Sequence, residues 1–161
     1  MKVATQSSLF CTFGLAEYLF GVNVLDVKEV NPETAFTPIP HAPPEVRGYV
    51  NLRGQIHLVL DLRLLLGLER AEATSESLLV IFKPAVGDAF GVVVDRIGDI
   101  VPVEADQVED WRASAKGPAA EGPRLRHAGD LIAGIAKLAG ELLILLEPRQ
   151  FLKAVERAAA D

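Results

Sequence analysis

Hydrophobic residues occur along the chain in short runs that are separated by polar stretches or by glycine and proline. Runs of this length are typical of β-strands, because a helix needs a longer periodic segment. Several runs are almost continuously apolar, which is typical of strands covered on both faces. The predicted strands are residues 9–13, 20–24, 56–60, 78–82, 90–94, 97–101 and 142–146.

Helical signals are few. Residues 61–67 predict one short helical turn, with Asp61 as the N-cap and Gly67 as the stop. Pro148 precedes an alanine-rich segment that runs to residue 160 and predicts a C-terminal helix with proline in its first turn. Loops are predicted at residues 31–47, which hold five prolines, at 112–129, rich in alanine, glycine and proline, and at the polar linker 69–77.

The chain contains an internal repeat. Residues 20–30 align with residues 90–100 at an offset of 70, with identical Phe and Gly at the start, and the same offset carries back to Leu9 over Leu79. Residues 48–61 align with residues 134–147 at an offset of 86, and Arg63 then corresponds to Arg149. The larger offset requires an insertion in the second unit, which we place in residues 112–129. The pattern predicts two similar all-β units, about 9–67 and 79–152.

Each predicted unit is too small for a large core of its own. Units of this size are stabilised by packing against each other, and small curled sheets hide their edges by closing into barrels. We therefore expect an all-β protein in which the two units pack together.

The two units differ at a predicted turn. Gly54 and Gly140 correspond in the repeat, and both suit a tight turn between strands. Arg53, however, aligns with Ala139, and Asn51 aligns with Lys137. Arg53 is therefore not required by the turn itself. We expect it to pair with Glu29, ahead of Asp61, because an unpaired buried charge costs several kcal/mol. The pair either fastens one barrel or lies on the rim of a groove that binds a partner protein.

Composition narrows the functional classes. The 161 residues carry 16 Lys+Arg and 22 Asp+Glu, a net charge of -6 without a basic run, which argues against nucleic-acid binding. No apolar run approaches the length of a membrane span, and the N-terminus shows no export signal, so we expect a soluble, cytoplasmic protein without direct membrane contact. The single Cys11 excludes an internal disulfide.

No motif predicts an enzyme, a metal site or a cofactor. The serines lie in no GxSxG context and there is no glycine-rich phosphate loop. The three histidines, His41, His57 and His127, are far apart, which gives a zinc site little support. Asp95 and Asp99 are four residues apart, but turn or solvated carboxylates explain them without an acid–base pair.

Four segments together resemble the CheW-like family. They are Val27-Lys-Glu29-Val30, then Ile39-Pro40-His-Ala-Pro43, then Gly48-Tyr-Val-Asn51-Leu-Arg53-Gly54, and then Asp61-Leu-Arg63; residues 92–100 and 134–137 continue the match. The resemblance covers one domain at about 8–155. It implies two five-stranded SH3-like barrels, with a short helix after the first unit and a C-terminal helix.

The resemblance implies a chemosensory adaptor without catalysis. Such an adaptor couples the cytoplasmic hairpin tip of chemoreceptors to the regulatory domain of the histidine kinase CheA and can self-associate in array rings. The implied receptor-binding residues are Val27, Glu29, Gly48, Arg53, Ile97 and Ile100. The implied kinase-binding residues are Leu78 and Leu79, although leucines at the start of a strand also suit the core.

Some points stay open at this level. Flagellar taxis, pilus motility and other chemosensory outputs all use relatives of this adaptor. A small-barrel module that binds a ligand or nucleic acid is a further alternative. The 112–129 insertion is longer than is typical of the family, and Trp111 at its start suits a packing anchor.

Overall fold

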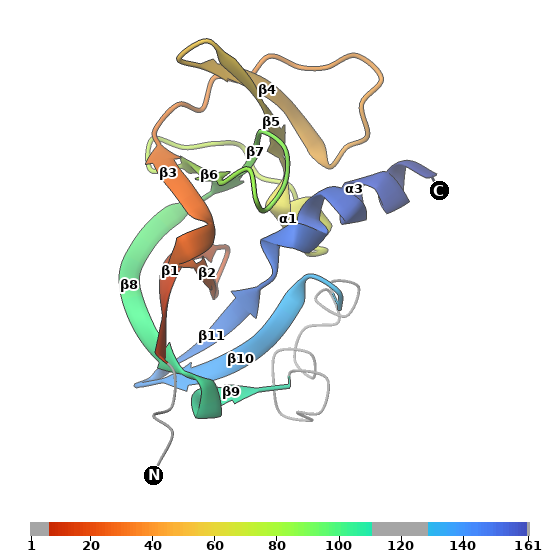
Figure 1. The fold of residues 1–161 in the computed structure, drawn as a ribbon. Coiled ribbons are helices and arrows are strands. Elements are labelled where there is room, and N and C mark those ends of the chain that lie inside the picture. Colours follow the sequence, from red (N-terminus) through yellow and green to blue (C-terminus); the bar gives the residue numbers. More distant parts are fainter. Residues whose placement is uncertain (1–6, 111–128, 161) are drawn as a thin grey trace.

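The computed structural model describes residues 7–110 and 129–160 and is built from two β-sheets and two α-helices (Figure 1). A six-stranded sheet has the order β8-β1-β2-β11-β10-β9, and a five-stranded sheet has the order β3-β6-β7-β5-β4. The strands are β1 (Ser7–Leu15), β2 (Tyr18–Asn23), β3 (Val27–Asn31), β4 (Val46–Leu52), β5 (Gln55–Leu60), β6 (Leu78–Phe82), β7 (Phe90–Val94), β8 (Arg96–Glu104), β9 (Val108–Glu109), β10 (Ile132–Leu138) and β11 (Glu141–Leu146). The two sheets and the predominance of strands confirm the predicted all-β fold class.

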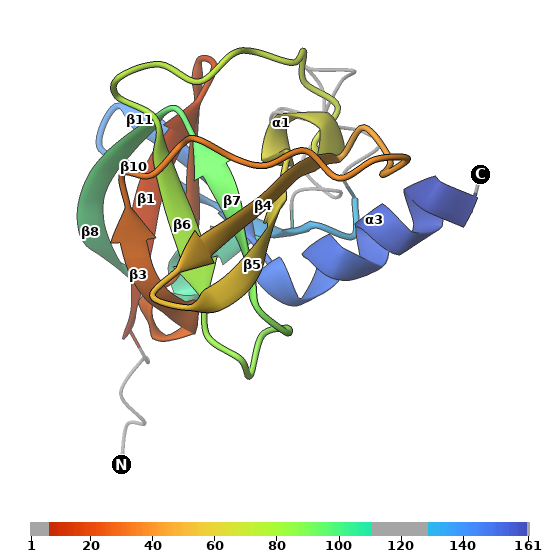
Figure 2. The ribbon, with the colours of Figure 1, turned by 90° about the horizontal axis from the view of Figure 1, so that it is seen from above.

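Both predicted helices are present. Helix α1 (Leu62–Leu65) begins at Asp61, whose side chain accepts the N–H of Leu64 at 3.1 Å and is thus the predicted N-cap. A 3-10 helix, η4 (Pro148–Gln150), leads into helix α3 (Phe151–Ala160). Figure 2 shows α3 extending away from the sheets towards the C-terminus. Two further 3-10 turns, η1 (Val24–Asp26) and η2 (Ala105–Gln107), connect strands.

Each sheet contains strands from both halves of the chain. Strands β1 and β2 pair with strands of the second half, while β6 and β7 complete the sheet that holds β3, β4 and β5. Two parallel pairs join the halves, β5 with β7 and β11 with β2. The remaining strand pairs are antiparallel. The sequence repeat is therefore expressed as an exchange of hairpins between two sheets.

Strand registers follow the repeat, with one correction. The β4–β5 hairpin and the β10–β11 hairpin have the same register at an offset of 86, so that Val50 opposite His57 corresponds to Ala136 opposite Leu143. In the first strands, however, Phe13 pairs with Ile97 and Phe82 pairs with Val27, which makes Phe13 the counterpart of Phe82 at an offset of 82 − 13 = 69. The expected alignment of Leu9 with Leu79 is thus wrong by one residue. The segment from Phe82 to Phe90 is one residue longer than the equivalent segment from Phe13 to Phe20.

The main core lies between the sheets. Among the described residues it contains 23 buried ones, drawn from both sheets and from both helices, whereas the clusters within the five-stranded and six-stranded sheets contain six and four. In β6 and β7, Val80 and Val92 belong to the main core, while Leu79 and Val93 belong to the smaller cluster on the opposite face. This alternation explains why these strands are apolar at every position. Full burial of one such side chain contributes about 1.5–3 kcal/mol.

All seven predicted strands are present, but β3, β4, β9 and β10 are absent from that prediction. Strand β3 has alternating partly buried and exposed residues, and β4 and β10 are interrupted by glycine and by polar residues, so none forms an apolar run. The predicted anchor Trp111 and residues 112–128 of the predicted insertion lie outside the described residues.

Candidate protein-binding surface

The β4–β5 hairpin presents Arg53 at its tip. The two turn residues both have positive φ, 51° at Arg53 and 86° at Gly54. The side chain of Asn51 supports this turn, because its Oδ1 accepts the N–H of Gly54 at 2.9 Å. In the corresponding β10–β11 turn only Gly140 has positive φ, and Lys137 replaces Asn51. The first turn therefore holds Arg53 in a left-handed backbone conformation, and the hydrogen bond to the Asn51 side chain stabilises that turn.

Arg53 forms an ion pair with Glu29 of β3, as the sequence predicts. The Arg53 side chain is 67 % exposed and the Glu29 side chain is 23 % exposed. The hydrogen bond from Arg53 lowers the pKa of Glu29 below its usual range. Because the pair is exposed rather than buried, it contributes little to folding stability, which leaves both side chains available to a partner.

Exposed aliphatic side chains accompany this pair on the free edges of the two sheets. Strand β3 is an edge of the five-stranded sheet and β8 is an edge of the six-stranded sheet, and both lie on the same side of the molecule in Figures 1 and 2. Val30 on β3 is 40 % exposed, while Ile97 and Ile100 on β8 are 37 % and 57 % exposed. Aliphatic edges of this kind are typical of surfaces that bind another protein.

The other predicted contact residues are less accessible. Val27 is half-buried and packs against the main core. Gly48 is buried at φ 145°, and a Cβ at this position would lie 2.3 Å from the carbonyl oxygen of Thr37, so glycine is needed for a close backbone approach. Leu78 is partly buried against the main core, and Leu79 is fully buried inside the five-stranded sheet. The structure thus brings Glu29 and Arg53 into contact and places Gly48 and Leu79 in supporting positions.

Three residues of this region were not predicted as site residues: Val30, Asn51 and Ile56. Ile56 lies directly opposite Asn51 in the hairpin and is 51 % exposed. The apolar run 56–60 does not by itself reveal this exposure, because sequence alone does not show where a strand emerges from the covered part of its sheet. For Asn51 the sequence did contain a signal: the repeat has Lys137 at the equivalent position, so asparagine is not required by the strand itself.

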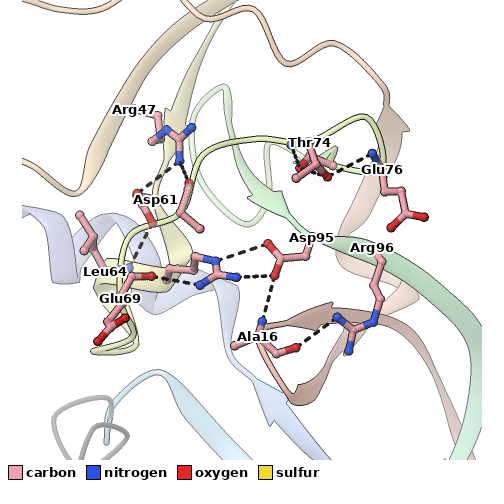
Figure 3. A network of polar contacts seen from close by, with 12 residues as sticks. Ala16, Arg47, Asp61, Leu64, Glu69, Thr74, Glu76, Asp95 and Arg96 are labelled. Carbon is pink, nitrogen blue, oxygen red and sulfur yellow. Dashed lines mark hydrogen bonds and ion pairs between the residues drawn. The ribbon is translucent and has the colours of Figure 1, made fainter.

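Asp95 has a structural role at the junction of the halves. It accepts hydrogen bonds from Arg63 of α1 at 2.5 Å and from the backbone N–H of Ala16 at 2.9 Å (Figure 3). The side chain of Asp99 is exposed, and its backbone carbonyl accepts the hydroxyl of Thr12 at 2.5 Å. Asp95 therefore connects α1, β8 and the β1–β2 turn, and it is engaged in an ion pair rather than in an acid–base pair with Asp99.

The described residues contain few side chains suited to nucleophilic catalysis or metal binding. Cys11 is buried, and burial raises the pKa of its thiol, which disfavours the reactive thiolate. Among residues 7–110 and 129–160, no group of three or more His, Cys, Asp or Glu side chains is placed to hold a metal ion. The helices of this part of the chain are also too short and too polar to cross a membrane.

The two packed sheets with an exposed, aliphatic and charged edge define a protein-binding module. A model of the CheW-like domain matches residues 9–156, and the chain therefore belongs to the CheW-like domain family. It is 28 % identical over 148 residues to a chemotaxis protein CheW of Rhizobium meliloti, covering 92 % of this chain and 89 % of that protein. It is 29 % identical to a chemotaxis protein CheW of Klebsiella aerogenes, covering 97 % and 87 %.

A solved structure has the same fold. The crystal structure of the scaffolding protein TtCheW from Thermoanaerobacter tengcongensis matches with a TM-score of 0.76 and 25 % sequence identity. The match covers 91 % of this chain and 92 % of that one, so the similarity extends over both sheets rather than one of them.

Proposed function

We propose that this protein is a cytoplasmic chemosensory adaptor, which couples chemoreceptors to the histidine kinase CheA by binding both and catalyses no reaction. The observation that carries this proposal is the family match over residues 9–156, together with similarity to chemotaxis proteins named CheW along nearly the whole chain. The functional unit is then the entire two-sheet module, and its activity lies in the surfaces that it presents.

The receptor-binding surface is centred on the Glu29–Arg53 pair and the exposed Ile97 and Ile100. The main core fills the space between the sheets, so a receptor helix docks along the exposed edges rather than deep between them. Helical partners bury aliphatic side chains in such a site, while the charged pair fixes their orientation. Val27 and Gly48 act beneath the surface, Val27 by packing and Gly48 by allowing Thr37 to approach β4.

The kinase-binding surface is centred on the start of β6. Leu78 is partly exposed and can contact the regulatory domain of CheA directly, while the buried Leu79 anchors β6 in its sheet. Each contact is small, so we expect affinities near the micromolar range, about -8 kcal/mol. Many linked weak contacts are sufficient in an array, and self-association into rings would raise the effective concentration further.

Two variants test the two surfaces separately. The measurement is calorimetric binding to a soluble receptor hairpin fragment and to a CheA regulatory domain encoded in the same genome. Arg53→Ala should weaken receptor binding by about tenfold and leave kinase binding unchanged, because it removes an exposed charge from one surface. Leu78→Thr should weaken kinase binding and preserve receptor binding. Arg70→Ala, which removes an exposed arginine from the linker, is the matched control and should change neither.

Loss of both activities in one folded variant would show that the surfaces are not separate. Wild-type protein that binds neither partner at several hundred micromolar would contradict the adaptor function itself. Tight binding of a nucleic acid in a mobility-shift assay would instead favour the small-barrel alternative.

A further inference from the structure

A groove lies beside the six-stranded sheet, where β10 begins, β11 ends and η1 passes close to both. Its volume is about 550 Å³. Apolar side chains form much of its wall, among them Phe10, Leu145 and Leu25, which is 70 % exposed. Glu147 and Arg149 supply charge at the end of β11. An open groove with aliphatic walls and a carboxylate suits a side chain that is apolar along its length and positive at its tip.

The first half of the chain shows how the equivalent space is filled. At the offset of 86, Ala133 corresponds to Arg47 and Glu147 corresponds to Asp61. The guanidinium of Arg47 donates from Nη1 to the Asp61 carboxylate at 3.5 Å and to the carbonyl oxygen of Ala71 at 3.3 Å (Figure 3). The Arg47 side chain is only 11 % exposed. An arginine therefore occupies the position that the alanine methyl leaves open in the second half.

The arginines Arg63 and Arg149 correspond, and each is already paired with a carboxylate from the other half of the chain, although those two carboxylates do not occupy equivalent positions. Arg63 pairs with Asp95 in the first site, and Arg149 donates from both terminal nitrogens to Asp26 at 3.1 Å in the second. Glu147 caps η4 through Oε2, which accepts the N–H of Arg149 at 3.1 Å and its Nη1 at 3.3 Å. Its Oε1 accepts no hydrogen bond from any residue that the structure describes. The second site thus retains the capping carboxylate, which Arg149 pairs through Oε2, but it has no counterpart of Arg47 to reach Oε1.

We propose that this groove binds an arginine side chain from an exposed segment of a partner protein. The guanidinium donates to Glu147 Oε1, and the aliphatic stem lies against Leu25 and Leu145. Arginine is favoured over lysine because an arginine fills the equivalent site, where Nη1 of Arg47 donates to both a carboxylate and a backbone carbonyl. The proposal goes beyond the adaptor function and does not depend on it, since the groove shares no residue with the receptor-binding or kinase-binding candidates.

A defined peptide tests the proposal. The probe is the acetylated and amidated peptide Ala-Leu-Arg-Leu-Ala, titrated into the full chain labelled with ¹⁵N and followed by amide chemical shifts. The control peptide has citrulline in place of arginine, because citrulline has nearly the same shape without the charge. We expect saturable shifts at Leu25, Ala133 and Glu147, and an affinity about fivefold higher for the arginine peptide, as a partly exposed charged hydrogen bond would give.

Two variants locate the binding. Glu147→Gln keeps an oxygen that can cap η4 but removes the charge, and it should abolish the preference for arginine over citrulline. Ala133→Arg copies Arg47 into the second half; it should block the peptide and raise the melting temperature, because its guanidinium can donate to Oε1 of Glu147 from within the chain. Glu141→Gln, at the exposed start of β11, is the matched control and should change nothing.

Three results would overturn the proposal: equal affinity for both peptides, shifts that map outside the groove, or unchanged peptide binding by folded Ala133→Arg. A lysine peptide that binds more tightly than the arginine peptide would also contradict it, because the copied geometry of Arg47 would then have no bearing on the groove.

Discussion

The ion pair between Arg53 and Glu29 is an exposed contact whose main effect is on the charge of Glu29. Because Arg53 donates to the Glu29 carboxylate, the pKa of Glu29 is lowered in the folded protein. A lowered pKa gives stability that is present above the unfolded value and is lost as the pH falls through the folded value. Solvent screening at the 67 % exposed Arg53 keeps this contribution small.

Replacement of Arg53 by alanine should therefore raise the titration midpoint of Glu29 while changing the free energy of unfolding by less than about 1 kcal/mol. The midpoint is measured from the ¹³C shift of the Glu29 carboxyl group, and stability from urea unfolding at neutral pH. Arg70→Ala serves as the control and should leave the midpoint unchanged. An unaltered Glu29 midpoint in Arg53→Ala would show that the two side chains are apart in solution.

The sequence could identify this pair because the repeat provides an internal comparison. Gly54 has the equivalent Gly140 in the second unit, so the turn itself explains why glycine is present. Arg53 is replaced by Ala139 in the second unit, so its presence needs another explanation. The same comparison does not predict exposure. Leu79 and Arg53 both match the family pattern, yet Leu79 is fully buried and Arg53 is at a hairpin tip, because the burial of a strand residue depends on what covers its sheet.

At the level of elements, the two helices begin in the same way but in different surroundings. Asp61 caps α1, is 2 % exposed and pairs with the largely buried Arg47, whereas Glu147 caps η4 and its side chain is 38 % exposed. A buried pair that loses one partner leaves an uncompensated charge, whereas loss of the exposed Glu147 removes a cap and one contact of Arg149, which stays paired with Asp26.

We therefore expect Asp61→Ala to lower the free energy of unfolding by about 3 kcal/mol or more, and Glu147→Ala to lower it by about 1 kcal/mol. Asp61→Asn, which keeps a capping oxygen, should fall between them. Urea unfolding of the three variants gives the comparison. Equal losses in Asp61→Ala and Glu147→Ala would mean that Arg47 contributes nothing through its pair with Asp61.

The local elements were predictable where hydrophobicity or capping residues mark them. Asp61 and Pro148 correctly located the helix starts, and apolar runs correctly located seven strands. Strand β3 was missed because it lies on a sheet edge with one exposed face, and its Val-Lys-Glu-Val-Asn sequence has no continuous run. Edge strands carry a weaker sequence signal than central strands for this physical reason.

At the level of the whole molecule, the exchange of hairpins was not predictable from the repeat. The repeat shows that two units are similar, but a hairpin can satisfy the same hydrophobic pattern in its own sheet or in that of its neighbour. The parallel pairs β5–β7 and β11–β2 determine which sheet each hairpin joins. Parallel pairing between distant strands leaves no local signature in the sequence. The outcome is one shared core, to which 23 buried residues of the described part of the chain belong, rather than two independent cores.

The shared core predicts that neither half folds alone. The linker at residues 69–77 is polar and largely exposed, so a break between Glu72 and Ala73 removes little packing. Fragments 1–72 and 73–161 should each lack a dispersed amide spectrum when alone, because each sheet would miss its exchanged strands and the core would miss one side. When mixed, they should restore the native spectrum with a midpoint that depends on concentration. If either fragment is well folded by itself, hairpin exchange is not what holds the two halves together.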